Sequence, residues 1–125
     1  MERGLEIVIF AAWQIDSMIQ RQDIKKWCEI VAREFRPEQI ILFGSYANGT
    51  PTEDSDVDVL VVMPLARGHR GVRQAAAIRE RVPAPFPMDV IVRSPQEIAR
   101  CLARGDSFIT GVLRCGQMMC EGEHT

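Results

Sequence analysis

Residues 40–63 read IILFGSYANGTPTEDSDVDVLVVM, and this stretch decides how the rest of the chain is interpreted. Its first apolar run ends at Gly44 and Ser45, and ten residues later Asp56 and Asp58 open a second apolar run. An Asn-Gly pair and a proline lie between the two runs and are strong turn signals. The stretch therefore predicts two strands joined by a turn, with a Gly-Ser pair after the first strand and two carboxylates at the start of the second.

Helical and strand-like patterns continue on both sides of this stretch. Helices are predicted where apolar residues recur at three- and four-residue spacing, and strands where short β-branched runs are bounded by turn residues. The predicted helices cover residues 5–20, 23–36, 72–82, 95–104 and 106–113, and the predicted strands cover residues 39–43, 56–63, 88–92 and 117–121. A short strand is the alternative for the first segment, because its run LEIVIF is rich in β-branched residues.

Several polar residues are expected to begin these helices. Asp23 is the predicted N-cap of the second helix, which must end before Pro37 because proline disfavours the helical conformation in the residue preceding it. Ser94 stands directly before a proline and is the predicted cap of a later helix. Asp106 or Ser107 is expected to cap the last one.

The alternation of strands and helices indicates the fold class. Three to four strands interleaved with helices predict an α/β (α+β) fold, in which one sheet is flanked by helices. At 125 residues and 46% hydrophobic content, the chain has the length and the apolar material of one domain. We expect a single domain over residues 1–125, with an N-terminal helical extension over residues 1–22 and a catalytic core over residues 23–121.

Composition excludes several classes of function. Lys+Arg 15 against Asp+Glu 17 gives a net charge of −2, so a basic surface for direct nucleic-acid binding is not expected. The four cysteines form no C-x-x-C pair, and the two histidines are not spaced to complete a zinc site with them. Reduced, mostly packed thiols are expected. No apolar run approaches the roughly 18 residues of a membrane span, and a cytoplasmic location is expected.

The acidic residues of the central stretch are the first candidates for chemistry. Asp56 and Asp58 project to the same side of the predicted strand, about 7 Å apart at a rise of roughly 3.3 Å per residue. Two carboxylates this close repel each other unless a cation lies between them, and Mg²⁺ prefers such oxygen ligands. Asp89 begins another apolar strand and is a candidate third carboxylate. The alternative is that all three acids are solvated strand ends.

The Gly44-Ser45 turn is the candidate phosphate site. Backbone N–H groups of a turn that follows a strand, together with a seryl hydroxyl, can hold phosphate oxygens. A Gly-Ser turn is common by itself. It indicates a phosphate site here because it stands at a fixed sequence distance from the acidic pair. Triphosphate and acidic residues are compatible only if a metal ion separates their charges.

Together these residues resemble a known family. The string GSYANGTPTEDSDVDVLVV and the later Asp89 look like the nucleotidyltransferase superfamily of DNA polymerase β, with the closest similarity to its small stand-alone MNT-type members. The resemblance covers residues 24–92 and extends more weakly to the C-terminal SFITGVLRCGQMMCE. It implies a mixed sheet of the nucleotidyltransferase type.

The resemblance also implies roles for single residues. Gly44 and Ser45 would bind the triphosphate, and Asp56 and Asp58 would ligate two Mg²⁺ ions. Asp89 would ligate one of these ions and help to deprotonate the attacking hydroxyl. The implied reaction transfers a nucleoside monophosphate from ATP or another NTP, with pyrophosphate leaving.

Only 36 residues follow Asp89, so the acceptor is expected to be another protein, or a partner is expected to complete the site. Small MNT proteins resemble antitoxins that pair with HEPN toxins, which implies transfer of AMP to a hydroxyl of a HEPN-type partner. Two alternatives stay open: an antitoxin that acts by stoichiometric binding without catalysis, and transfer to a small molecule or RNA. A homo-oligomer or hetero-oligomer is compatible with each of these functions.

Two further features have open interpretations. Five arginines between Arg67 and Arg81 could bind an acidic partner or the triphosphate, but a solvated helix face is favoured. Tyr46, beside the Gly-Ser turn, could stack near the nucleotide or pack in the fold.

Overall fold

The computed structural model describes residues 19–122. Most of the predicted helix over residues 5–20 and of the expected N-terminal extension lies outside the described residues. The helices are α2 (Arg21–Phe35), α3 (Ser45–Asn48), α4 (Gly71–Arg81), α5 (Pro95–Ala103) and α6 (Ser107–Cys115). The strands are β1 (Gln39–Phe43), β2 (Val57–Val62), β3 (Met88–Arg93) and β4 (Gln117–Glu121).

The four strands form one mixed sheet, which confirms the predicted fold class. Their order is β3-β2-β1-β4, and β1 pairs antiparallel with both β2 and β4. The chain then crosses from β2 through α4 to β3, which pairs parallel with β2. This crossover brings the start of β3 to the edge of the sheet where β2 also starts and β1 ends.

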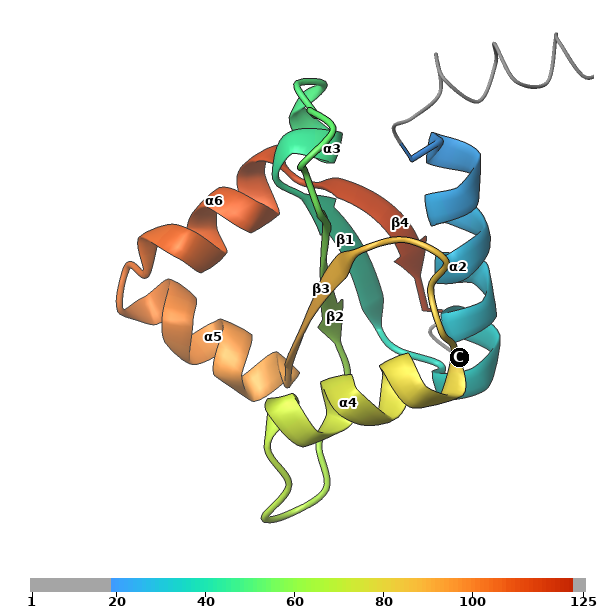
Figure 1. Cartoon of the computed structure of the whole chain (residues 1–125). Coiled ribbons are helices and arrows are strands. Elements are labelled where there is room, and N and C mark those ends of the chain that lie inside the picture. The colour runs from blue at the N-terminus through green and yellow to red at the C-terminus, as the bar shows by residue number, and fades with distance from the viewer. Residues whose placement is uncertain (1–18, 123–125) are drawn as a thin grey trace, which may run out of the picture.

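Helices cover both faces of the sheet (Figure 1). On one face, the alternating valines of β2 pack with buried residues of α2 and α4, including Trp27 and Ile78. On the other face, Leu60 and Val62 pack with Ile109 and Val112 of α6. Because side chains alternate along a strand, Asp58 belongs to this second face, the face covered by α6.

The predicted N-cap of α2 is wrong. The helix begins at Arg21 with Gln20 as N-cap, and the N–H of Asp23 donates to the Gln20 carbonyl at 3.0 Å, so Asp23 already lies in the first turn. There its carboxylate complements the positive end of the helix dipole instead of capping it. The two later caps are confirmed: Ser94 forms a capping box with Glu97, and Asp106 accepts from the N–H of Ile109.

Buried contacts fix the helices against the sheet without any covalent cross-link. The indole N–H of Trp27 donates to the Val82 carbonyl at 2.8 Å, which joins α2 to the end of α4. All four cysteines are free, and burial raises the pKa of the fully buried Cys28 to about 12, so it remains a neutral thiol. Cys115 differs from the expectation of packed thiols, because it is exposed. Within residues 19–122, no helix has the length and apolarity to cross a membrane.

Candidate active site

The candidate residues meet at one edge of the sheet. Phe43, the last residue of β1, is the register partner of Asp58 on β2, and Asp58 is the register partner of Asp89 on β3. Neighbouring strands lie about 4.8 Å apart, so the two aspartates are adjacent across the parallel pair. Gly44 and Ser45 follow Phe43 directly and therefore lie at the same edge.

Gly44 is in direct contact with the Asp58 side chain. Its backbone has φ 76° and ψ −156°, a conformation adopted almost only by glycine. A Cβ at this position would overlap Asp58 Oδ2 and would lie 3.3 Å from its Cγ. The backbone of the Gly-Ser turn thus approaches the carboxylate as closely as the chain allows, and any other residue would displace one of the two.

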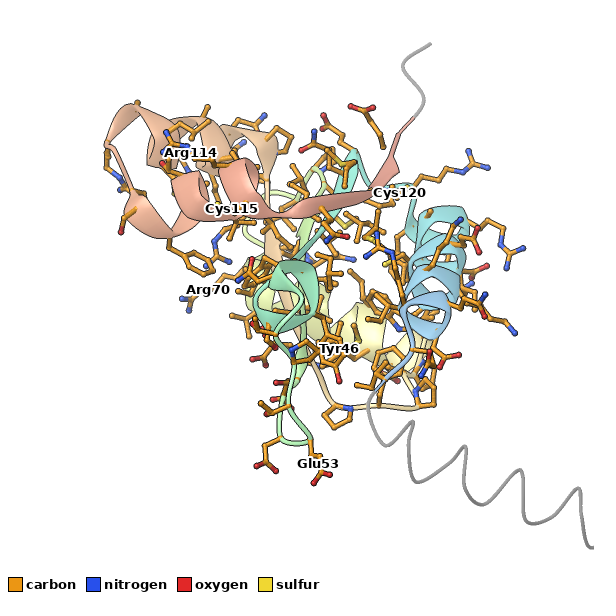
Figure 2. The ribbon with its side chains drawn as sticks, turned by 90° about the horizontal axis from the view of Figure 1, so that it is seen from above. Tyr46, Glu53, Arg70, Arg114, Cys115 and Cys120 are labelled. Carbon is orange, nitrogen blue, oxygen red and sulfur yellow. The ribbon has the colours of Figure 1, made fainter. Side chains whose placement is uncertain are left out.

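The short helix α3 is held from two sides. The Gln117 side-chain amide on β4 donates to the Ala47 carbonyl at 2.7 Å. The Tyr46 hydroxyl accepts from the N–H of Ile19 at 3.2 Å, and Figure 2 shows Tyr46 on the side of α3 that faces α2. Tyr46 therefore packs in the fold, which answers the question that its sequence position left open. No side chain caps the start of α3. The N–H groups of Ala47 and Asn48 donate to the Gly44 carbonyl, which leaves those of Ser45 and Tyr46 for a ligand.

The acidic edge carries negative charge without a counter-ion. Burial raises the pKa of Asp58 above its ordinary value, and the negative charges of Asp89 and then Asp56 raise it further. Within residues 19–122, the one salt bridge joins Arg81 and Glu34 and lies elsewhere. Carboxylate oxygens in mutual repulsion suit a hard divalent cation such as Mg²⁺.

The acids are not gathered into a closed metal site. No group of three or more His, Cys, Asp or Glu side chains in the described part of the chain is arranged to hold an ion. Asp56 and Asp89 are exposed and Asp58 is half-buried. The oxygen donors of these carboxylates fit Mg²⁺ in their chemistry, although the three side chains do not converge on one point.

A small apolar cavity adjoins Gly44, which sequence reasoning missed. It has a volume of about 280 Å³ and lies between the end of β1 and α6. The rings of Phe43 and Phe108 meet edge to face beside it, with centroids 5.6 Å apart. Phe43 directly precedes the Gly-Ser pair, which is a signal the sequence did contain. Nothing local to Phe108 indicates its place.

The arginines between Arg67 and Arg81 do not act as one cluster. All five are exposed, and Arg81 at the end of α4 pairs with Glu34 of α2 at 2.9 Å. Arg70, labelled in Figure 2, is the N-cap residue at the opposite end of the helix. These arginines are distributed before α4 and along it, and this distribution favours the interpretation that they form a solvated helix face.

Relatives with this pattern are known. A family model described as a nucleotidyltransferase domain matches residues 24–113. Two curated relatives from Methanocaldococcus jannaschii are named putative protein adenylyltransferases. One is 43% identical over 47 residues, or 36% of this chain and 47% of the relative. The other is 39% identical over 41 residues, or 33% of this chain and 41% of the relative. The chain thus matches less than half the length of either relative.

The fold also has a solved counterpart. A crystal structure of a putative nucleotidyltransferase from Sulfolobus solfataricus superposes with a TM-score of 0.56 at 23% identity, over 80% of this chain and 78% of that one. At this identity the likeness concerns the fold. The family model spans most of the chain and includes the Gly-Ser turn and all three candidate acids. The protein is therefore a member of the nucleotidyltransferase domain family.

Proposed function

We propose that this protein transfers a nucleoside monophosphate from an NTP to a hydroxyl group, using the edge formed by Gly44, Ser45, Asp56, Asp58 and Asp89. The observation that supports the proposal most directly is the placement of Asp58. It pairs in register with Asp89 on one side and contacts the backbone of Gly44 on the other. Carboxylates for metal ions and a turn for phosphates are thereby adjacent.

The chemistry required of these residues is positioning and charge compensation. The hydroxyl oxygen forms a bond to the α-phosphorus while the bond from that phosphorus to the β-bridging oxygen breaks, and pyrophosphate leaves. Two Mg²⁺ ions, when bound, neutralise the attacking and leaving oxygens. Asp56 and Asp58 would hold both ions. Asp89 would hold one and accept the hydroxyl proton, and Gly44 and Ser45 would orient the triphosphate through N–H and hydroxyl donors.

Protein adenylylation is the activity we propose, with ATP as donor. The names of the two curated relatives support it, since both are called putative protein adenylyltransferases. In that activity AMP goes to a hydroxyl of a partner protein. The sequence resemblance to MNT-type antitoxins favours a HEPN-type toxin as that partner, and a cytoplasmic location follows for such a pair.

The proposal is tested by incubating the protein with ATP, Mg²⁺ and a candidate HEPN-type partner. AMP addition raises the partner mass by about 329 Da, the mass of an adenylyl group, and peptide mapping locates the modified hydroxyl. The triple variant Asp56→Asn/Asp58→Asn/Asp89→Asn is expected to add no AMP. Protection against the toxin by this triple variant would instead support neutralisation by binding alone.

A further inference from the structure

The groove between α5 and α6 contains three arginine side chains that the proposed reaction does not use. Its volume is about 340 Å³, and its lining includes Arg93 at the end of β3, Arg100 on α5, Arg104 at the C-cap of α5, and Phe108 on α6. We propose that this groove is the docking site for an acidic segment of the acceptor protein. The inference rests on the proposed protein-directed transfer and names the surface that recognises the acceptor.

The groove carries a formal charge of +1, because the arginines Arg93, Arg100 and Arg104 outnumber the carboxylates Glu97 and Asp106 in its lining. Glu97 accepts from the backbone N–H of Ser94 at 2.9 Å, and Asp106 accepts from that of Ile109 at 2.9 Å. Neither carboxylate forms a salt bridge with an arginine of the groove, because the one salt bridge in residues 19–122 joins two other side chains. A local excess of positive charge thus exists on a chain whose net charge is −2.

The guanidinium groups keep donors free for a ligand. Arg93 uses Nη1 on the Val92 carbonyl at 2.9 Å, and Arg104 places Nη2 3.6 Å from Cys101 Sγ. Each guanidinium has five N–H donors in a planar fork, so most of them remain available. Arg100 in the last turn of α5 and Arg104 at its C-cap are four residues apart, and the helical conformation of the cap residue keeps them on one face. Such forks bind carboxylates through paired hydrogen bonds.

An acidic polypeptide fits this groove better than a free anion, because the groove continues into apolar surface. Phe108 lines it and is 47% exposed. Arginine and aromatic side chains together are typical of the residues that dominate protein interfaces. A free phosphate would engage the arginines and leave the Phe108 ring uncovered.

Phe108 also connects the groove with the candidate active site. The same residue lines the cavity beside Gly44, and its ring meets that of Phe43, the register partner of Asp58. A segment whose acidic side chains occupy the arginines would follow Phe108 toward Gly44. Its hydroxyl-bearing residue would then arrive at the edge of the sheet that carries the acids.

The test measures binding of a fluorescein-labelled peptide, Asp-Glu-Asp-Glu-Tyr-Gly, by fluorescence anisotropy at low salt. Arg100→Glu/Arg104→Glu is expected to weaken binding at least tenfold. The control Arg33→Glu/Arg79→Glu changes the net charge equally at exposed positions of α2 and α4, and is expected to stay within twofold. Equal losses in both variants would overturn the proposal. Circular dichroism verifies that each variant is folded. If Arg100→Glu/Arg104→Glu unfolds the protein, the milder variant Arg100→Gln/Arg104→Gln is compared with the control instead.

Two further sets of binding and transfer measurements distinguish a peptide ligand from phosphate, and failure of the docking site from failure of the proposed function. A peptide with Asn and Gln in place of Asp and Glu is expected to bind at least tenfold more weakly. Inorganic phosphate that displaces the acidic peptide at a concentration below that of the peptide itself would identify a phosphate site and overturn peptide docking. Asp58→Asn should retain peptide binding and lose nucleotidyl transfer. Transfer that persists in Asp58→Asn refutes the proposed function, whereas unchanged peptide binding in the Arg100/Arg104 variant refutes only the docking site.

Discussion

Asp58 and Asp89 are register partners in the parallel pairing of β2 with β3. The pairing places two carboxylates side by side on the face of the sheet that α6 covers, at the edge where the Gly-Ser turn begins. The mutual repulsion of these carboxylates is unfavourable in the absence of a cation, and it is the property that would make the edge bind one. The fold therefore stores a local electrostatic cost at the candidate active site.

Replacing Gly44 by alanine should destabilise the protein by about 3 kcal/mol or more. The backbone conformation of Gly44 costs any other residue about 1–3 kcal/mol, and overpacking adds a comparable amount. The overpacking cost comes from the overlap of the added Cβ with Asp58 Oδ2. Urea unfolding followed by circular dichroism measures the change.

Gly49→Ala is the matched control for this experiment. Gly49 has φ 79° and ψ 19°, the left-handed region, whereas Gly44 has ψ −156°, and no atom lies within 4 Å of a Cβ built at Gly49. Its substitution should cost about 1–2 kcal/mol, which is the backbone term alone. Equal losses for the two alanine variants would show that neither the ψ of −156° nor the contact with Asp58 adds to the cost at Gly44.

Asp58→Asn should raise the thermal midpoint of the metal-free protein at neutral pH. The pKa of Asp58 is raised on folding, so the folded state binds more protons than the unfolded state between the two pKa values. The free energy of unfolding of the wild type therefore falls as the pH rises from the unfolded-state pKa to the folded-state pKa of Asp58. Above the folded-state pKa, the full loss of stability is present. Differential scanning fluorimetry between pH 3 and pH 8 should show the advantage of the variant vanish toward the acid end. An advantage that grows toward pH 3 would contradict the sign of the shift.

Magnesium should stabilise the wild type and have little effect on Asp58→Asn. A ligand that binds only the folded state contributes roughly 2.7 kcal/mol at a free concentration of 100 Kd. For a domain of this size that corresponds to a rise of several degrees in the thermal midpoint. The same titration with K⁺ at matched ionic strength controls for screening, and an equal response of the variant to Mg²⁺ would place the ion elsewhere.

Gln117→Ala should weaken the support of α3. The substitution removes the hydrogen bond from the Gln117 amide to the Ala47 carbonyl, at a cost of about 1 kcal/mol. Because α3 begins at Ser45 with Gly44 as its N-cap, the KM for ATP should also rise while the acids remain intact. Gln96→Ala, at an exposed position of α5, should change neither quantity. Loss of stability with an unchanged KM would show that α3 does not position the nucleotide.

Much of the fold was predictable because its signals are local. The strand 39–43 and the helix that follows Ser94 were predicted within a residue or two, since β-branched runs and the capping serine act over a few residues. Asp23 misled the prediction because a carboxylate is favourable both as a cap and within the first turn, and the helix begins two residues earlier.

The relationships that assemble the site were not predictable in the same way. The register between β2 and β3 depends on the path of the intervening crossover. The contact between Gly44 and Asp58 depends on a second register, that of the antiparallel pairing of β1 with β2. The arginines of the groove were also missed. Arg100 and Arg104 have the spacing of one helix face, but their convergence with Arg93 requires the packing of α5 against the end of β3.

The most direct test of the account is Mg²⁺-dependent transfer from ATP labelled at its α-phosphate. The single variants Asp58→Asn and Asp89→Asn should each lose roughly 10²-fold or more in rate, because a metal that stabilises the transition state contributes several kcal/mol. Glu53→Gln/Asp54→Asn removes two exposed acids from the nearby turn, where Figure 2 labels Glu53, and should transfer at the wild-type rate. Wild-type rates in both Asp58→Asn and Asp89→Asn would contradict the assignment of this edge as the catalytic site.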